Sequence, residues 1–289
     1  MSRDTSFYYS FLVLPPPQRR AIIAVWDFCR VVDDAVDTQP DEARARAELA
    51  TWKRELDAVY GASPSTALGA AAPQTEQGRA LQRWVTAFSL SRKNFDALME
   101  GVEMDLQPRR YSTLADLREY AERVASAVGL ICLEIFGVRD GSADPYAREL
   151  GIALQLTNIL RDVPADLAAG RIYLLREDQE ATGCTDDMLR AAVAARGVTD
   201  ERVRALLARH GRRARDAFAR AAEAFPAPAA RKLVAAEIMN AVYRRLLDKI
   251  ERRRFDVFSG RVTVPRPERA RVALGVYLRT LAGLHRPRK

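Results

Sequence analysis

Residues 21–37 combine an almost wholly apolar helix pattern with one narrow acidic stripe. The polar members of this segment are Asp27, Arg30, Asp33, Asp34 and Asp37. At about 100° per residue they fall within an arc of roughly 120° on a helix. A helix with apolar side chains around most of its circumference is expected to be buried. The stripe then brings four carboxylates and one arginine into the interior, where unpaired charge is costly.

Residues 150–166 repeat this combination. Gln155, Asn158, Asp162 and Asp166 fall within about 80° of one another on a helix whose other positions are mostly apolar. Asp162 and Asp166 are spaced i, i+4, as are Asp33 and Asp37, so each pair puts two carboxylates one turn apart on one face. Such carboxylates repel each other unless a cation lies between them. Pro164 interrupts the helical hydrogen bonds between the two aspartates and predicts a kink there.

The remaining apolar periodicity predicts helices only. They lie at residues 41–60, 76–89, 91–106, 113–137, 185–195, 199–224, 228–258 and 265–283. No segment shows the sustained alternation of a strand, and no repeat recurs at a fixed period. Residues 61–75 form a Gly-, Pro- and Ala-rich loop, but the first helix alone cannot bury its apolar surface, so we place no boundary there. The sequence predicts an all-α protein with a single domain over residues 1–289.

The amino-acid composition limits which kinds of metal site the chain can form. With 289 residues, of which 48% are hydrophobic and 29% charged, the chain is typical of a globular protein. Its three cysteines lie far apart and its two histidines lack partners at metal-ligand spacing, which argues against zinc and against a disulfide framework. A metal site would therefore use oxygen ligands, which favours Mg²⁺ or Mn²⁺. Without a visible signal peptide or an apolar run of membrane-spanning length, we expect a cytoplasmic protein.

The net charge of +8 is distributed unevenly. Residues 196–289 contain 24 Lys or Arg against 9 Asp or Glu, a balance of +15. Solvated helix faces account for most of these residues, and peripheral contact with an anionic membrane is the functional alternative. We expect no nucleic-acid partner, because the acidic helices would repel a phosphate backbone.

The two acidic helices suggest a shared metal site. If they face each other across a cavity, they can hold divalent cations whose other ligands come from a diphosphate. Arg30, Arg161 and Arg171 lie close to these motifs in sequence and are candidates to bind the same phosphates. A single DxxxD pair is a weak signal, but we put the chance of two such pairs on apolar helices at roughly one in ten. For Gln155, a buried hydrogen bond within the protein is an equally good explanation.

With these motifs, the chain resembles the squalene/phytoene synthase family of head-to-head prenyl transferases. The first signature is matched by residues 29–37, CRVVDDAVD, and the second by residues 155–166 together with Gly170-Arg171-Ile172-Tyr173-Leu174. Further matches are Ser6-Phe7-Tyr8-Tyr9, residues 101–106, Tyr120 with the small residues at 124–129, and residues 236–243. Trp26 departs from the tyrosine that is common in the family, and Pro164 interrupts its second motif.

The resemblance implies a helical bundle around a central apolar cavity and assigns roles to individual residues. It implies Mg²⁺ ligands at Asp33, Asp37, Asn158, Asp162 and Asp166. It implies catalytic roles for the four aspartates of this set and for Tyr120 and Arg171. It implies substrate contacts at Phe7, Arg30, Asp34, Gln155, Asn158, Arg161, Tyr173 and Tyr243.

Within the family, the sequence is most similar to the bacterial presqualene diphosphate synthases of hopanoid biosynthesis. This similarity implies condensation of two farnesyl diphosphates, without NADPH, to a product that later isoprenoid enzymes consume. Phytoene or diapophytoene synthesis is the close alternative. A non-catalytic scaffold of the same fold is the alternative from another class, although a scaffold has no need of buried carboxylates.

Overall fold

The protein is described by a computed structural model, which covers residues 8–61, 72–107, 109–198 and 200–284. Within these ranges the chain is helical and contains no strand, which confirms the predicted fold class. The elements are α1 (Tyr8–Leu12), α2 (Pro16–Asp37), α3 (Glu42–Gly61), α4 (Glu76–Phe88), α5 (Arg92–Glu103), η1 (Met104–Leu106), α6 (Leu114–Ala121), η2 (Glu122–Ser126), α7 (Ala127–Phe136), α8 (Asp144–Ala168), α9 (Arg176–Thr182), α10 (Asp186–Ala195), α11 (Glu201–Glu223), η3 (Ala227–Ala229), α12 (Val234–Arg252) and α13 (Arg266–Leu281).

Most predicted helices are present, and the differences have local causes. The short helix α9 follows the segment at residues 171–174 and is too polar to give an apolar period. The predicted helix at 228–258 begins only at Val234, because Pro226 and Pro228 lie in the chain before it. The predicted helix at 113–137 contains a π-helical turn, η2, between α6 and α7. At Pro164, α8 continues as one helix to Ala168.

The apolar side of α2 is buried as its pattern predicts, but the acidic stripe is not in the interior: Asp27 is half-buried, and Arg30, Asp33, Asp34 and Asp37 are exposed. The helix begins at Pro16, where a proline is compatible with the first helical turn, and it ends where Thr38 bonds back to the Asp34 carbonyl. Its apolar side packs against α3, α4, α5 and α7. Phe28 is fully buried there and makes edge contacts with the rings of Trp52 and Phe95.

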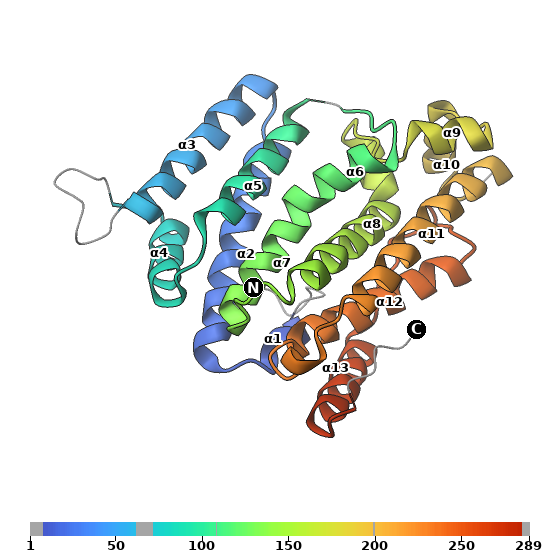
Figure 1. Ribbon diagram of the computed structural model, residues 1–289. Coiled ribbons are helices and arrows are strands. Elements are labelled where there is room, and N and C mark those ends of the chain that lie inside the picture. Colours follow the sequence, from blue (N-terminus) through green and yellow to red (C-terminus); the bar gives the residue numbers. More distant parts are fainter. Residues whose placement is uncertain (1–7, 62–71, 108, 199, 285–289) are drawn as a thin grey trace.

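Helix α8 runs through the middle of the bundle (Figure 1) and packs against α11, α7 and η2. The approach to η2 is very close, because a Cβ at Gly151 would lie 2.7 Å from the backbone of Ser126. Ser126 in turn donates a hydrogen bond to the Arg148 carbonyl. The small residues around η2 thus serve tight helix packing, and they also form one wall of the cavity described below.

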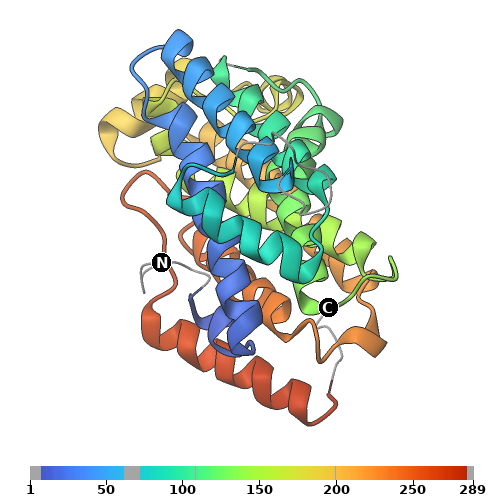
Figure 2. The same ribbon diagram turned by 90° about the vertical axis from the view of Figure 1, so that its left-hand side faces the viewer.

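Helices α1 and α13 lie together at one end of the bundle, beside the start of α2 (Figure 2). Arg19 of α2 donates to the carbonyls of Phe11, Leu12 and Leu14, so it satisfies the carboxyl end of α1. Helix α13 packs on α12 and α1. The chain that leads from α12 to α13 borders the same cavity.

Candidate active site

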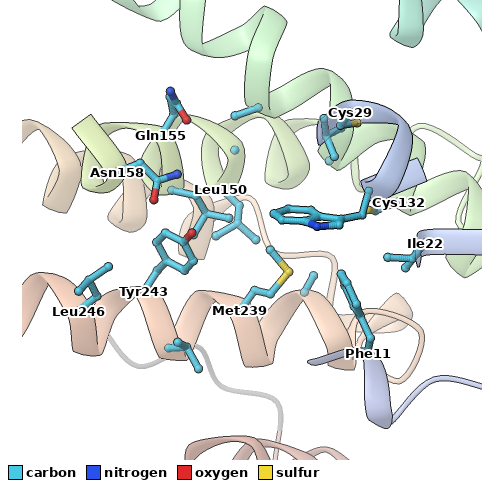
Figure 3. A pocket seen from close by; sticks show the side chains of 18 of the residues that line it. Phe11, Ile22, Cys29, Cys132, Leu150, Gln155, Asn158, Met239, Tyr243 and Leu246 are labelled. Carbon is cyan, nitrogen blue, oxygen red and sulfur yellow. The ribbon is translucent and has the colours of Figure 1, made fainter. Parts of the chain in front are cut away.

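A cavity of about 860 Å³ lies between α2, α7, α8 and α12. Its walls are mainly apolar, with contributions from Phe11, Trp26, Leu150 and Met239. Residues 261–266, before and at the start of α13, line it as well. Figure 3 shows Gln155, Asn158 and Tyr243 close together on one side of the cavity, with Phe11, Ile22 and Cys132 on the other. The cavity therefore has one polar end and one apolar end, and its volume suits a large organic ligand.

The first acidic motif meets the cavity at Asp33. This side chain lines the cavity and is exposed to water. Asp37 lies one turn further along α2 and forms an ion pair of 2.7 Å with Arg171. Arg30 and Asp34 do not line the cavity; they pair with each other at 3.7 Å, and both side chains are more than half exposed. The stripe thus divides into one carboxylate that faces the cavity, Asp33, and two ion-paired carboxylates with half-exposed side chains, Asp34 and Asp37.

The second acidic motif is already engaged with arginines. Asp162 accepts from Nε of Arg161 at 2.9 Å and pairs with Arg261 at 3.2 Å. Asn158 and Arg161 line the cavity and are hydrogen-bonded to the Tyr243 hydroxyl. Burial raises the pKa of that hydroxyl, so Tyr243 is a neutral phenol at the polar end.

Asp105, which did not appear among the predicted site residues, joins two tyrosines that did. It accepts from the hydroxyls of Tyr120 at 2.7 Å and Tyr173 at 2.8 Å. The rings of Tyr120 and Tyr173 are stacked with centroids 5.2 Å apart, and Tyr111 lies 5.6 Å from the ring of Tyr120. We call Asp105, Tyr111, Tyr120 and Tyr173 the tyrosine–aspartate cluster. None of them lines the cavity itself.

Backbone contacts fix the position of this cluster. Arg110 and Ile172 form a parallel bridge, and the amide of Arg176 donates to the Tyr111 carbonyl at 3.0 Å. These contacts hold the segment after Gly170 against the segment before α6. Tyr173 consequently faces Tyr120, and Arg171 is held beside Asp37.

The positively charged side chains at the polar end do not neutralise all of its carboxylates. Burial and the neighbouring Asp37, Asp105 and Asp34 raise the pKa of Asp33 to about 7. Burial and Asp162 likewise raise the pKa of Asp166 to about 7, and Asp105 and Asp37 add to this shift. Burial opposes the charge on Arg171, but Asp37 and Asp105 raise the pKa of its guanidinium overall. Asp37 and Asp105 raise the pKa of both Asp33 and Asp166, so the carboxylates of the two motifs lie close enough to repel one another.

The donor set fits a divalent cation, although its side chains are not arranged around one. Over the described ranges, no three His, Cys, Asp or Glu side chains converge closely enough to bind a metal ion. Oδ1 of Asn158, however, is buried without a hydrogen-bond partner at the polar end. An unsatisfied amide oxygen beside carboxylates that repel one another is the environment a hard cation stabilises.

The structure brings most of the predicted site residues together, but not all. Five of them line the cavity: Asp33, Gln155, Asn158, Arg161 and Tyr243. Asp37, Tyr120, Asp166, Arg171 and Tyr173 surround Asp105 beside it, as their hydrogen bonds and charge interactions show. Arg30 and Asp34 point outward, and Phe7 lies outside the described residues. Sequence analysis missed Asp105 and Arg261; only the family match at residues 101–106 drew attention to the former.

A helical bundle with two acidic motifs at the polar end of an apolar cavity is the architecture of a prenyl-diphosphate enzyme. Residues 1–268 match the family model described as squalene/phytoene synthase. The chain therefore belongs to the squalene/phytoene synthase family of head-to-head prenyl transferases.

Individual relatives support this membership. A presqualene diphosphate synthase of Sinorhizobium fredii is 36% identical over 245 residues, covering 84% of this chain and 82% of the relative. A 15-cis-phytoene synthase of Synechococcus elongatus is 35% identical over 283 residues, covering 90% and 84%. Among solved structures, a ligand complex of a dehydrosqualene synthase matches with a TM-score of 0.81 at 27% identity, covering 97% of this chain and 93% of the other.

Proposed function

We propose that the protein condenses two farnesyl diphosphates head to head, giving presqualene diphosphate and releasing one diphosphate. The observation that carries this proposal is the cavity with one acidic, arginine-bearing end and otherwise mainly apolar walls. It is also supported by three relatives at 36–38% identity that are named presqualene diphosphate synthase.

The polar end is where the diphosphate groups bind in this proposal. Asp33, Asp37, Asn158, Asp162 and Asp166 would hold Mg²⁺, whose charge neutralises a diphosphate and makes it a better leaving group. Arg171 and Arg161 supply fixed positive charge, and Arg261 adds a third guanidinium. Because these arginines now pair with Asp37 and Asp162, diphosphate binding requires them to exchange one anion for another.

The apolar walls protect the reactive intermediate. When the first diphosphate leaves, an allylic cation remains, and water would trap it as an alcohol. Trp26, Leu150 and Met239 exclude water from the wall of this chamber. The double bond between C2 and C3 of the second substrate then attacks the cation, and loss of one proton closes the cyclopropane ring.

The tyrosine–aspartate cluster orients neutral hydroxyls next to the acidic end. Burial and the nearby Asp105 hold the pKa of Tyr120 well above its usual range, so its hydroxyl stays protonated and donates to Asp105. Tyr173 does the same on the other carboxylate oxygen. We assign Asp105 a positioning role, since it fixes both phenols with their oxygen lone pairs available to other donors.

Phytoene synthesis is the second candidate, and the match to the Synechococcus enzyme, which covers 90% of this chain, favours it. The two candidates differ in chain length, farnesyl or geranylgeranyl, and in whether the cyclopropyl diphosphate is the final product. A non-catalytic scaffold is the candidate from another class. NADPH is not part of the proposed reaction, and later isoprenoid enzymes are its proposed partners.

One incubation distinguishes these candidates. The protein is mixed with farnesyl or geranylgeranyl diphosphate and Mg²⁺, without NADPH, and the products are identified by mass spectrometry. Presqualene diphosphate from the shorter substrate supports the proposal. Phytoene from the longer one supports the second candidate, and absence of turnover with either substrate supports the scaffold.

A further inference from the structure

The most exposed large apolar side chains of the described ranges gather at one end of the bundle. They are Leu12 of α1, which is 43% exposed, and Leu274, Leu278, Leu281 and Leu284 in and after α13, which are 54–65% exposed. Helices α1 and α13 pack against each other at the lower end of the bundle in Figure 2. Isolated exposed leucines are ordinary, but a group confined to two neighbouring helices indicates an interaction surface.

The leucines of α13 form one stripe. Leu274, Leu278 and Leu281 are spaced i, i+4, i+7, and we call them the leucine face. Ala273 and Val276 are buried on the other side of the helix, which packs on α12 and α1. The protein's own packing is thus complete without the leucine face.

The charged residues around the leucine face indicate which kind of partner surface it binds. Arg271 and Arg279 are exposed beside the leucines. Residues 269–289 contain six Lys or Arg and no Asp or Glu. Glu268, at the start of α13, is paired with Lys249 at 2.9 Å. In a dimer through this face two arginine-rich helices would repel each other, whereas anionic lipid headgroups attract both the helix and the segment after it.

The leucine face also adjoins the cavity. Phe11 of α1 and Pro265, Arg266 and Arg269 at the start of α13 line the cavity wall. The helices that carry the exposed leucines therefore also close the compartment that holds prenyl chains under the proposed function. None of the described helices is long and apolar enough to cross a bilayer.

We propose that α13, with α1, docks on the surface of an anionic lipid bilayer, with the leucine face among the acyl chains and its arginines at the headgroups. The biological purpose of this docking rests on the proposed function, because docking would place the cavity wall next to the bilayer into which a lipid product passes. Its physical test is independent of turnover.

The test is flotation of the full chain with vesicles. Vesicles of phosphatidylcholine with about one third phosphatidylglycerol should carry the protein upward, and pure phosphatidylcholine vesicles should carry much less. The triple variant Leu274→Ser, Leu278→Ser, Leu281→Ser should lose at least about tenfold in binding to the anionic vesicles. Arg271→Ala with Arg279→Ala should weaken binding and reduce its salt dependence. The matched control is Arg44→Ala with Arg46→Ala on α3, also exposed, which should float like the wild type.

Wild-type protein that stays at the bottom of the gradient, or a triple variant that floats equally well, would overturn the proposal. So would a wild-type dimer, measured by light scattering without lipid, that the triple variant abolishes while neither protein floats. Thermal melting of each variant controls for folding. Turnover of detergent-dispersed farnesyl diphosphate should be unchanged in the triple variant, so failure of docking and failure of the proposed function give different results.

Discussion

The carboxylate of Asp178 and those at the acidic end of the cavity have pKa values shifted in opposite directions. Asp178 of α9 is 1% exposed and accepts from Arg209 at 2.8 Å and from Arg213 at 2.9 Å. Burial alone would raise its pKa, but the two guanidiniums lower it below the usual range. Asp33 and Asp166 are less enclosed than Asp178, yet the charges nearest to them are mostly other carboxylates, and the pKa of each rises to about 7.

The opposite pKa shifts distinguish a carboxylate that stabilises the fold from carboxylates that await a ligand. Asp178 is satisfied by the chain itself and ties α9 to α11. The acidic end of the cavity has an excess of negative charge that the chain leaves uncompensated, and a cation with a diphosphate would complete it. A substitution at Asp178 should therefore affect stability, and a substitution at the acidic end should affect turnover.

The largest effect is expected at the acidic end. Asp33→Ala or Asp162→Ala should lower turnover by more than about 10³-fold, since each removes a carboxylate from the proposed Mg²⁺ set. The melting temperature should not fall in Asp33→Ala, because the substitution relieves repulsion with Asp37, Asp105 and Asp34. Kinetics with farnesyl diphosphate and circular-dichroism melting measure the two quantities. Asp34→Ala, in the exposed pair with Arg30, should lose far less activity. Retained activity in both main variants would contradict the assignment.

The second effect should appear in stability. Asp178→Ala leaves Arg209 and Arg213 without their shared counter-charge, and we expect a loss of about 2 kcal/mol in the free energy of unfolding. For a chain of this size that lowers the melting temperature by about 5 °C. The matched control is Asp187→Ala, which removes a carboxylate that is 92% exposed in its pair with Arg190. Equal melting temperatures for the two variants would show that the pairing of Asp178 is not structural.

A smaller effect is expected from the tyrosine–aspartate cluster. Asp105→Asn replaces a charged acceptor of two phenols by a neutral one, and we expect about a tenfold lower kcat. KM should change little if Asp105 positions Tyr120 and Tyr173 rather than contacting substrate. The matched control is Tyr111→Phe, because the Tyr111 hydroxyl has no hydrogen-bond partner and its loss should leave kcat unchanged. A merely structural Asp105 would instead give a lower melting temperature with kcat preserved.

Periodicity predicted the two acidic helices because burial and helical spacing both follow from local sequence. The apolar run of α2 and the polar stripe of α8 placed Asp33, Gln155 and Asn158 at the cavity, where the structure has them. The same argument did not predict α9, whose seven residues are mostly polar and are held by the pairs of Asp178.

Helical periodicity could not predict contacts between residues that are distant in sequence. Asp105 reaches Tyr120 and Tyr173 across 15 and 68 residues, and it has no i, i+4 carboxylate to attract attention. Arg261 meets Asp162 through the segment before α13, whose path no helical period describes. The resemblance to a family drew attention to Asp105 only through the matched segment around it, and it assigned outward-facing Arg30 and Asp34 to the substrate.

The smallest effect concerns the dependence of stability on pH in metal-free protein. In the folded chain the pKa of Asp33 is about 7, against an ordinary value of 3.8, so the folded state binds the proton more tightly. The stability contributed by this group is fully present below about pH 4 and is lost as pH rises to about 7. In the presence of a chelator, Asp33→Asn should therefore melt like the wild type below about pH 4 and at a higher temperature than the wild type at about pH 8. Asp178→Asn should show the reverse trend, with its deficit shrinking as pH falls, because the pKa of Asp178 is lowered. Added Mg²⁺ should raise the melting temperature of the wild type more than that of Asp33→Asn, since the cation favours the ionised carboxylate. If the difference in melting temperature between Asp33→Asn and the wild type stays constant from acid to alkaline pH, the chain itself already neutralises the negative charge of Asp33.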